Sequence, residues 1–537
     1  MSITDALAQA VRATLAEMGI EVPGGAVRLE RPARAEHGDF ATNAALAAAR
    51  AARRAPRALA EELARRLAEA TLPHVASVEV AGPGFVNFRL DPSWLYEALR
   101  ELLVAGETGY ACPDLGQGER VQVEFVSANP TGPLHVGNGW LGAYGDALAR
   151  LLGRCNWRVE REYYVNDTGN QIRLLGESLL ARRRGEAVPE QGYQGEYVAQ
   201  LARRYDGPED VTVAGRFAAE HILENIRSTL ARLGIHYDSW YSQASIEESG
   251  KVAETIELMR SRGLVYERDG ATWLASSRLG DARDRVLVKS DGELTYLAGD
   301  LAYHRDKFLV RGFDRVIDVF GADHHGQVAS LKAGVAALGI DPSRLEVHLG
   351  QLVSLVGGER MSKRSGVYVR LDDLVDDLGP DATRLMALTS SIDQATTLDV
   401  DLVKRQSMEN PVYYVQYAHA RIASIARFAA ERGASRPPLE ATDLSQLVHE
   451  RELALLRTLE LLPATVAEAA LERAPYKVTN WVRRLAGEFH GFYHDCRVVG
   501  DGIAPPLAAA RLWLVEGTRI GLAIALDLLG VSAPEVM

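Results

Sequence analysis

One stretch of the chain restricts its possible folds more than any other. It consists of an apolar, β-branched run at residues 120–128, a loop of turn-forming residues at 129–138, a helical periodicity at 139–155 and a second strand-like run at 157–165. A strand, a helix and a strand in this order form a crossover in which the two strands are parallel and the helix packs on the sheet. The sequence therefore predicts an α/β domain built on a parallel sheet.

A second crossover of the same kind is predicted further along the chain. Its strand, helix and strand lie at residues 314–325, 328–339 and 345–357. Between the two crossovers we expect an insertion of mixed helix and strand, at about residues 180–285, so that the sheet is doubly wound in two halves. Ligands of such sheets bind beyond the carboxyl ends of the strands. Residues that follow the predicted strand ends are therefore the first candidates for a binding site.

The segments on either side of this sheet have different patterns. Residues 77–90 alternate in the manner of strands around a Gly-Pro-Gly turn, and helical patterns precede them. From residue 371 onward nearly the whole sequence has helical periodicity. We therefore expect four parts: a small α+β domain at 1–110, the parallel-sheet domain at 111–370, a linking helical region at 371–410 and an all-α domain at 411–537.

The charge of the chain limits the kind of nucleic-acid binding that it can support. Its 537 residues include 72 acidic and 60 basic side chains, and this net charge of −12 argues against nonspecific coating of nucleic acid. A shaped RNA-binding surface needs only a local group of basic residues. One such group consists of Arg50, Arg53, Arg54, Arg57, Arg65 and Arg66. On a helix these arginines could face RNA phosphates, or they could form a solvated face paired with Glu61 and Glu62.

The sequence also bears on location and on metal binding. No apolar run reaches the roughly 18 residues that a membrane span needs, and the N-terminal segment lacks the leader pattern of a signal peptide. We therefore expect a cytoplasmic protein without membrane contact. Cys112, Cys155 and Cys496 are far apart and form no metal-binding or disulfide pattern. The Asp-His-His run at 323–325 has no third ligand at zinc spacing, so we expect no metal site there.

The loop at residues 129–138 has the chemistry of a phosphate-binding site. It ends a predicted strand and opens a predicted helix, whose first N–H groups and positive dipole end favour an anion. His135 could donate a hydrogen bond to a phosphoryl oxygen as negative charge develops. Gly137 would let a nucleotide base approach the backbone closely. A His-x-Gly sequence is common by chance, so this loop gains weight only together with a second feature.

The second feature is a basic loop after the strand that ends near residue 357. It consists of Arg360, Met361, Ser362, Lys363 and Arg364, followed by Ser365 and Gly366. Adjacent cations on a loop of small residues could close over a triphosphate and offset the charge of departing pyrophosphate. Taken alone, the segment would be interpreted as an exposed basic turn.

Together the two loops resemble the paired motifs of a known enzyme class. HVGN at 135–138 and MSKRSG at 361–366 are similar in order and separation to the HIGH and KMSKS motifs of class I aminoacyl-tRNA synthetases. The resemblance extends over nearly the whole chain, and its most specific parts resemble the arginyl-tRNA synthetases. These parts lie at residues 124–138, 161–171, 284–304 and 410–422.

This resemblance implies a fold and a reaction. The fold would be a Rossmann-like doubly wound catalytic domain with an N-terminal domain that binds the tRNA elbow. An all-α anticodon-binding domain would follow, entered through residues 381–384. The reaction would activate L-arginine with ATP and Mg²⁺ to arginyl-adenylate and transfer the arginine to the 3′ end of tRNA(Arg). The resemblance also implies that tRNA must be bound before activation proceeds, and we expect a monomer.

Two positions depart from the class motifs. Asn138 stands where the class has histidine, and it can donate a hydrogen bond but cannot carry positive charge. Arg360 stands where the second motif begins with lysine, which preserves charge but not geometry. Lys363 matches the second lysine of that motif. The resemblance therefore implies that His135, Asn138 and Lys363 are catalytic. It also implies an ATP site formed by His135, Gly137, Asn138, Met361, Ser362 and Lys363.

An arginine site must satisfy a guanidinium with five donors and an α-ammonium group, so it should be rich in acceptors. The matching positions of the family are Glu124, Asn129, Tyr296, Asp300 and Gln327. We expect Glu124 and Asn129 near the α-amino end of the substrate. Tyr296 and Asp300 would share one face of a helix and lie near the guanidinium. Each also has a structural interpretation: Asp300 as a helix cap, Tyr296 as a core aromatic residue and Gln327 as a surface amide.

Several alternatives compete with this interpretation. A small-molecule nucleotidyltransferase could share the sheet, but it would have no use for the flanking domains. A tRNA-binding relative without activity is disfavoured by the intact His135, Gly137 and Lys363. A cysteine-specific synthetase would require zinc-binding thiols, and an apolar substrate would not call for Asp300 and Glu124. The segment 193–197 resembles a family segment near the acceptor end of tRNA, although a simple surface loop is an equal alternative.

Overall fold

The computed structural model describes residues 3–22, 27–32, 34–351, 353–355, 369–405, 407–434 and 436–537. The chain divides into two compact units. The first unit contains Met1–Gly106, Ala429–Glu460 and Gly491–Gly517, and the second contains Glu107–Phe428, Leu461–His490 and Thr518–Met537. Among the helices described, none combines the length and the apolar character needed to cross a membrane.

The first unit begins with a small α+β domain, as the sequence predicts. Three helices pack on an antiparallel sheet with the strand order β1-β3-β2. The elements are α1 (Ile3–Glu17), β1 (Phe40–Thr42), α2 (Ala44–Ala52), α3 (Pro56–Glu69), β2 (Val75–Ala81) and β3 (Phe85–Leu90). Leu7, Val11 and Leu15 recur at helical spacing and are buried, so α1 turns one apolar stripe into the core. The predicted hairpin is confirmed, whereas β1 is too short to have been predicted.

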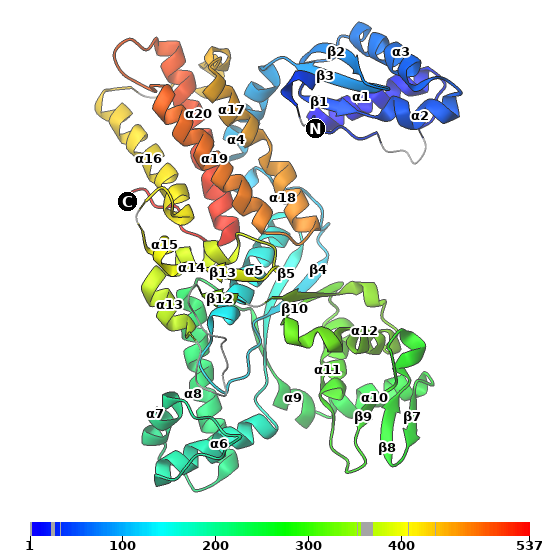
Figure 1. Cartoon of the computed structure of the whole chain (residues 1–537), viewed down its shortest axis with the longest axis vertical. Helices are drawn as coiled ribbons and strands as arrows, with labels where there is room; N and C mark the ends of the chain where they lie inside the picture. Colours follow the sequence, from blue (N-terminus) through cyan, green and yellow to red (C-terminus); the bar gives the residue numbers. More distant parts are fainter. Residues whose placement is uncertain are drawn as a thin grey trace. The chain divides into compact units, whose positions relative to one another are not determined.

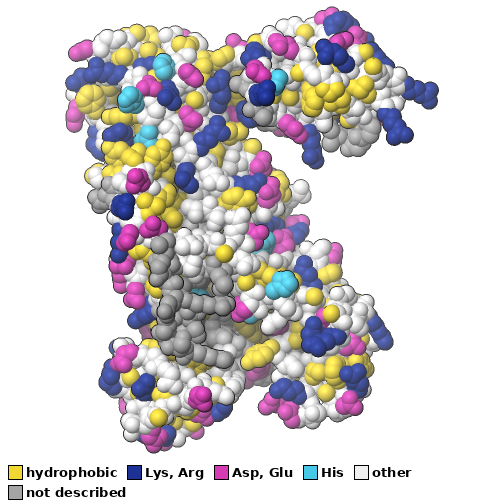
Figure 2. Space-filling view, in the orientation of Figure 1, with side chains coloured by type: hydrophobic (Ala, Val, Ile, Leu, Met, Phe, Trp, Pro, Cys, Tyr) yellow, Lys and Arg dark blue, Asp and Glu magenta, His cyan; other side chains and the backbone are white. Residues whose placement is uncertain are grey.

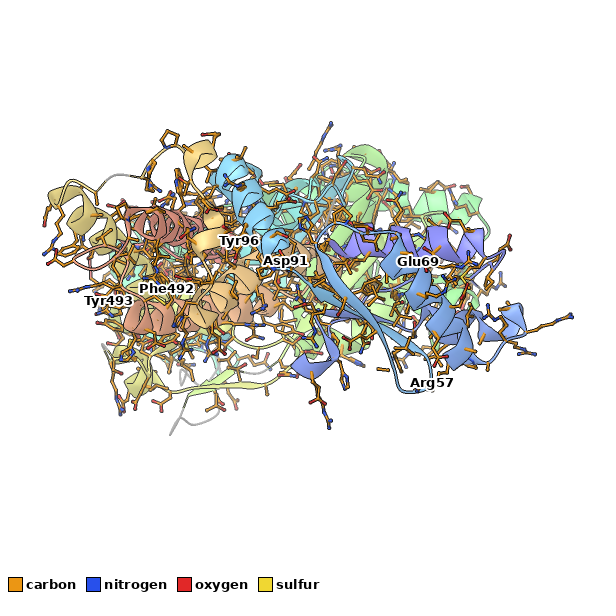
Figure 3. All side chains as sticks on the ribbon, turned by 90° about the horizontal axis from the view of Figure 1, so that it is seen from above. Arg57, Glu69, Asp91, Tyr96, Phe492 and Tyr493 are labelled. Carbon is orange, nitrogen blue, oxygen red and sulfur yellow. The ribbon has the colours of Figure 1, made fainter. Side chains whose placement is uncertain are left out.

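Helical segments complete the first unit. Among them are α17 (Glu450–Glu460) and most of α4 (Ser93–Gly109), a helix that the sequence patterns did not predict. Tyr96, labelled in Figure 3, donates its hydroxyl proton to the backbone carbonyl of Leu447 at 2.9 Å. Arg31 forms an ion pair with Glu460 at 2.6 Å and lies over the ring of Phe40. These contacts attach the α+β domain to the helices of its unit.

The second unit is built on a five-stranded parallel sheet with the order β11-β10-β4-β5-β6 (Figure 1). Its strands are β4 (Arg120–Phe125), β5 (Arg158–Val165), β6 (Ser239–Ser242), β10 (Arg315–Gly321) and β11 (Leu345–Gly350). α5 (Val136–Arg154) connects β4 to β5, and α12 (Val328–Ala337) connects β10 to β11. Both predicted crossovers and the doubly wound α/β fold are therefore confirmed.

The helix α5 approaches the sheet very closely. A Cβ atom added at Gly145 would lie 2.2 Å from the ring of Phe125, so only glycine permits this packing against β4. Most side chains between Val136 and Leu152 are buried, because the sheet lies on one side of α5 and further helices on another. Close packing holds the N-terminus of α5 at the carboxyl end of β4.

The stretch predicted as an insertion contains both helices and strands. Its elements, with the helix that follows them, are α6 (Asn170–Arg184), α7 (Glu196–Arg204), α8 (Val211–Arg232), α9 (Gln243–Glu248), α10 (Lys251–Ser261), β7 (Val265–Arg268), β8 (Ala271–Leu274), β9 (Arg285–Val288) and α11 (Tyr296–Arg305). The strands β7, β8 and β9 form a separate antiparallel sheet. β6 lies within the same stretch but joins the central sheet as its edge strand.

The chain beyond β11 is mainly helical, as predicted. Its elements are β12 (Val353–Leu355), α13 (Leu371–Leu378), α14 (Pro380–Ala387), β13 (Thr396–Leu398), α15 (Val400–Lys404), α16 (Pro411–Glu431), α18 (Leu462–Leu471), α19 (Tyr476–Asp495) and α20 (Pro505–Leu529). The predicted strand at 345–357 is divided, because β11 joins the central sheet whereas β12 pairs with β13 in a small parallel sheet. Arg384 of α14 is buried and forms an ion pair with Asp146 of α5 at 2.6 Å, which fixes α5 from its other side.

Candidate active site

The N-terminus of α5 is closed by a reciprocal pair of hydrogen bonds. His135 is the N-cap residue, and its Nδ1 accepts from the backbone N–H of Asn138 at 3.3 Å. In return the Asn138 Oδ1 accepts from the backbone N–H of His135 at 3.1 Å. Because Nδ1 is the acceptor, the neutral ring carries its proton on Nε2, which is then the donor of this side chain. Asn138 is thus a buried capping residue that also fixes the tautomer of His135.

Gly137 has a local steric role in this turn. A Cβ atom at this position would lie 3.1 Å from Cε1 of the His135 ring, closer than an ordinary van der Waals contact. The absence of a side chain therefore makes room for the imidazole. The sequence had suggested room for a nucleotide base, and both uses require the same bare backbone.

The chain that follows the basic loop returns to the same turn. The backbone N–H of Leu371 donates to the Leu134 carbonyl at 2.8 Å, and that of Val136 donates to the Val369 carbonyl at 3.3 Å. The predicted site residues Met361, Ser362 and Lys363, with the rest of 356–368, lie outside the described residues.

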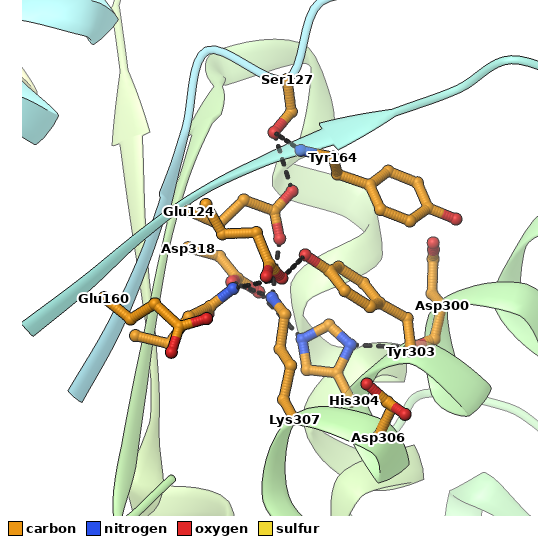
Figure 4. Close-up of polar contacts among 12 residues, drawn as sticks. Glu124, Ser127, Glu160, Tyr164, Asp300, Tyr303, His304, Asp306, Lys307 and Asp318 are labelled. Atoms are coloured by element: carbon orange, nitrogen blue, oxygen red, sulfur yellow. Dashed lines mark hydrogen bonds and ion pairs between the residues drawn. The ribbon is translucent and has the colours of Figure 1, made fainter. Parts of the chain in front are cut away.

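Three carboxylates stand side by side on the central sheet. Glu162 of β5, Glu124 of β4 and Asp318 of β10 are register partners on adjacent parallel strands. All three are buried, and Glu124 is only 3% exposed. Residues in register on neighbouring parallel strands point to the same face of a sheet, so three acidic groups share one buried surface. Figure 4 shows two of them, Glu124 and Asp318.

Cations from the π-helical turn after α11, Asp306–Val310, and from its C-cap residue Arg311 meet this row. The Lys307 Nζ donates to Glu124 Oε2 at 2.6 Å and to Asp318 Oδ1 at 2.9 Å (Figure 4). The Arg311 guanidinium donates to Glu162 at 2.8 Å. Burial opposes the charge of Asp318, but Lys307 and its neighbours outweigh it and lower the pKa of Asp318 to about 2. Burial raises the pKa of Glu124, and Lys307 opposes that rise.

Asp300 also lies on α11, but among the described residues no basic side chain forms an ion pair with its carboxylate. It is partly buried, and burial raises its pKa to about 6. Across the described ranges, no residue donates a hydrogen bond to its carboxylate. Tyr296 begins α11 one turn earlier and is 68% exposed. The predicted helix is confirmed, so the two side chains lie on one face as expected. The proposed alternatives, an α11 cap for Asp300 and a core position for Tyr296, do not match these positions.

The two predicted amides make separate local contacts. Asn129 follows β4 and donates from Nδ2 to Gln171 Oε1 at 2.7 Å. Gln327 is exposed at the end of the short helix Ala322–Gln327 after β10, and its Oε1 lies 3.3 Å from His324 Nδ1. Both follow carboxyl ends of sheet strands. The structure thus joins Glu124 to a cluster of charged and polar side chains around α11, which we call the α11 cluster. No described contact joins Asn129 or Gln327 to this cluster.

Several members of the cluster were not predicted from the sequence. They are Glu162, Asp318, Tyr303, His304, Lys307 and Arg311. A usable signal existed: acidic residues lie within three predicted strands, and His304, Lys307 and Arg311 follow one another at helical spacing. Buried charges must be paired. Acidic residues in buried strands therefore predict basic partners, and a row of basic residues on one helix face is a candidate for them.

The segment 193–197 contacts the first loop. Tyr197 of α7 donates its hydroxyl proton to the Thr131 carbonyl at 2.6 Å. A Cβ atom at Gly132 would meet the same hydroxyl at 3.1 Å.

In the described part of the chain, no group of three or more His, Cys, Asp or Glu side chains is arranged to hold a metal ion.

The fold and this site define a class I aminoacyl-tRNA synthetase. The chain matches three described sequence families: "Arginyl tRNA synthetase N terminal domain" at residues 3–90, "tRNA synthetases class I (R), catalytic domain" at 196–418 and "DALR anticodon binding domain" at 415–537. An arginine–tRNA ligase of Desulforudis audaxviator is 47% identical over 100% of this chain and 98% of its own length. One from Carboxydothermus hydrogenoformans is 46% identical over 95% and 94%.

A solved structure agrees with these relatives. The arginyl-tRNA synthetase of Thermus thermophilus is 25% identical, with a TM-score of 0.78, and all of both chains is covered. The chain belongs to the arginyl-tRNA synthetase family, and its enzymatic activity is that of an arginine–tRNA ligase.

Proposed function

We propose that the two halves of the site bind the two small substrates, ATP at the N-terminus of α5 and arginine at the α11 cluster. The observation that carries this proposal is the chemistry of the two places. One offers backbone N–H groups and a neutral imidazole donor, which suit an anion. The other offers the uncompensated carboxylate of Asp300, which suits a cation.

The reaction follows from bringing these substrates together. The arginine carboxylate attacks the α-phosphorus of ATP in line, which forms arginyl-adenylate and releases pyrophosphate. The terminal adenosine hydroxyl of tRNA(Arg) then attacks the acyl carbon and releases AMP. Neither step needs a covalent nucleophile from the protein, so positioning and charge stabilisation supply the rate. His135 would donate from Nε2 to a phosphate oxygen, with Asn138 holding the ring and Gly137 leaving room for it.

Lys363, Met361 and Ser362 would complete the ATP site from the other side. Lys363 precedes Val369 by six residues, a span of at most about 20 Å even when fully extended. Val369 is hydrogen-bonded to Val136 at the start of α5, so this tether supports a role for Lys363 next to His135. The ATP phosphates would bring Mg²⁺ with them; the described residues do not form a cage for the ion.

The arginine slot would combine Asp300 and Tyr296 at the guanidinium with Glu124 and Asn129 near the α-amino group. Asp300 supports this assignment because its carboxylate has acceptor capacity to spare. Glu124 has both oxygens engaged, by Ser127 at 3.0 Å and by Lys307, but each oxygen keeps a second lone pair. Gln327 would supply a further amide acceptor.

The remaining parts would bind tRNA(Arg). We assign the elbow to residues 1–110 and the anticodon to 411–537, joined through 371–410 to the catalytic part at 111–370. Arg57, Arg65 and Arg66 are paired with Glu61 and Glu62, the solvated-face alternative from the sequence. Arg50, Arg53 and Arg54 are exposed at the end of α2 and remain for phosphates; Figure 2 shows basic side chains at this end of the α+β domain.

A cavity of about 380 Å³ between the start of α16 and α19 suits an anticodon nucleotide. Its lining combines an aromatic ring with two guanidinium groups, which can stack on a base and contact phosphate. The lining residues are Met408, Glu409, Pro411, Tyr414, Asn480, Arg483 and Arg484. We further propose that the protein works as a monomer in the cytoplasm.

The test is ATP–pyrophosphate exchange with each of the common amino acids, with and without total tRNA. We expect exchange only with arginine and only when tRNA is present. Lys363→Ala should lower the exchange rate by about two orders of magnitude, as loss of one transition-state donor does. Lys404→Ala is the matched control, because Lys404 only pairs with Asp377 at the surface. Unchanged exchange in Lys363→Ala would remove Lys363 from the site.

A further inference from the structure

The row of three buried carboxylates requires an explanation beyond substrate binding. Adjacent strands lie about 4.8 Å apart, so Glu162, Glu124 and Asp318 bring like charges close together where water is excluded. Charges in such a place must be paired or neutralised. One continuous segment supplies the pairing, namely the end of α11 and the π-helical turn after it.

Lys307 is the centre of that pairing. Its side chain is completely buried and contacts carboxylates from two strands, Glu124 of β4 and Asp318 of β10. Burial disfavours its charge, but Asp318 and Glu124 outweigh this effect and raise the pKa of Lys307. The ammonium also lies 4.1 Å from the centre of the Tyr303 ring, a cation–π contact. Lys307 is therefore held as a cation inside the protein by the carboxylates around it.

His304 extends the pairing toward Asp300. Its Nε2 lies 2.9 Å from Asp318 Oδ2, and its Nδ1 lies 2.7 Å from the backbone carbonyl of Asp300. These two contacts hold the imidazole between Asp318 and the backbone of Asp300. In the part of the chain that the structure describes, no basic side chain forms an ion pair with the Asp300 carboxylate.

The residues that make these contacts are spaced so that they lie along one face of a helix. Asp300, His304 and Lys307 follow one another by four and three residues and so form a single stripe. The stripe continues into the π-helical turn, an irregularity that is rare and frequently found at functional sites. Through this stripe, the position of Asp300 on α11 is tied to the position of Glu124 on β4.

We propose that Lys307 is a positioning residue for arginine recognition, holding the Glu124 carboxylate in its binding orientation and, through Asp318 and His304, setting its distance from Asp300. This inference rests on the proposed arginine site. Ser127 and Lys307 each donate to one oxygen of Glu124 and so fix the plane of the carboxylate, while each oxygen keeps a lone pair for a further donor. Without Lys307, burial would favour the protonated form of Glu124, which binds a cation poorly.

The test is a double-mutant cycle on Lys307 and Glu124 in the full-length enzyme, measured by ATP–pyrophosphate exchange with tRNA present. Lys307→Met should raise the KM for arginine about tenfold or more, the worth of a charged hydrogen bond, and leave the KM for ATP within about twofold. Glu124→Gln should raise the arginine KM as well. Because Lys307 acts through Glu124, the double variant should match Glu124→Gln within about threefold.

The outcomes separate the inference from the proposed arginine site. An unchanged arginine KM in Glu124→Gln removes Glu124 from the site itself. A raised KM in Glu124→Gln but not in Lys307→Met, or effects that multiply in the double variant, overturns the role of Lys307. If Lys307→Met does not fold, the double variant, in which the lost cation and the lost anion cancel, is compared with Glu124→Gln alone. Arg285→Met, which breaks the pair with the buried Asp281, controls for general loss of stability and should leave the arginine KM unchanged.

Discussion

The two halves of the active site handle charge in opposite ways. At the N-terminus of α5 a capping box between His135 and Asn138 orders neutral groups and the first backbone N–H groups of the helix. Beside α11 the protein buries three carboxylates, Glu124, Asp318 and Glu162, together with the ammonium of Lys307. An anion can be held by aligned backbone N–H groups, whereas a guanidinium needs an ionised acceptor. The proposed arginine site therefore carries a desolvation cost that the proposed ATP site avoids.

The largest expected effect comes from removing the carboxylate that lacks a counterion. Asp300→Ala should raise the KM for arginine by about two orders of magnitude or more, as breaking a buried ion pair does, and leave the KM for ATP nearly unchanged. Exchange kinetics with each substrate varied in turn measure both values. The exposed Asp291→Ala is the control. If the KM values for ATP and arginine rose equally, the proposal that the two substrates bind at separate halves of the site would be wrong.

A smaller effect is expected at the neutral half. Asn138→Ala removes one bond of the capping box, which should lower stability by about 1 kcal/mol. It should also lower kcat for exchange by about tenfold, because the lost hydrogen bond from the His135 backbone N–H helps to hold that residue in place. Asn138→Asp keeps the acceptor for the His135 N–H, so it should retain stability while its negative charge opposes ATP. Thermal unfolding and exchange kinetics together test this, and equal stability of Asn138→Ala and the parent enzyme would contradict it.

The smallest expected effect is a pH dependence confined to one substrate. Burial raises the pKa of Asp300 to about 6, so the carboxylate that receives the guanidinium is ionised above this pH and protonated below it. The KM for arginine should therefore rise as the pH falls through 6, by up to about tenfold per unit. The KM for ATP should show no step that depends on Asp300. The comparison uses the parent enzyme and Asp300→Asn, in which the step in the arginine KM should disappear.

Much of the fold and part of the site could be predicted from local sequence patterns. The strand, turn and helix around His135 are encoded by periodicity and by capping residues within a short stretch. The spacing of Tyr296 and Asp300 similarly implied one helix face, because helical geometry is local. The strand β1 and the helix α4 were not predicted, since short or mixed patterns carry little periodic signal.

The sequence by itself determined the two crossovers, the helix start after the loop at 129–138 and the candidate residues that follow each strand. Only the tertiary structure decided that Glu162, Glu124 and Asp318 stand in one row, and that Lys307 lies between two of them. The physical reason is the distance along the sequence between the residues that interact. Helix periodicity and capping depend on neighbours a few residues away, whereas strand register and the pairing of buried charges depend on segments that packing brings together from distant parts of the chain.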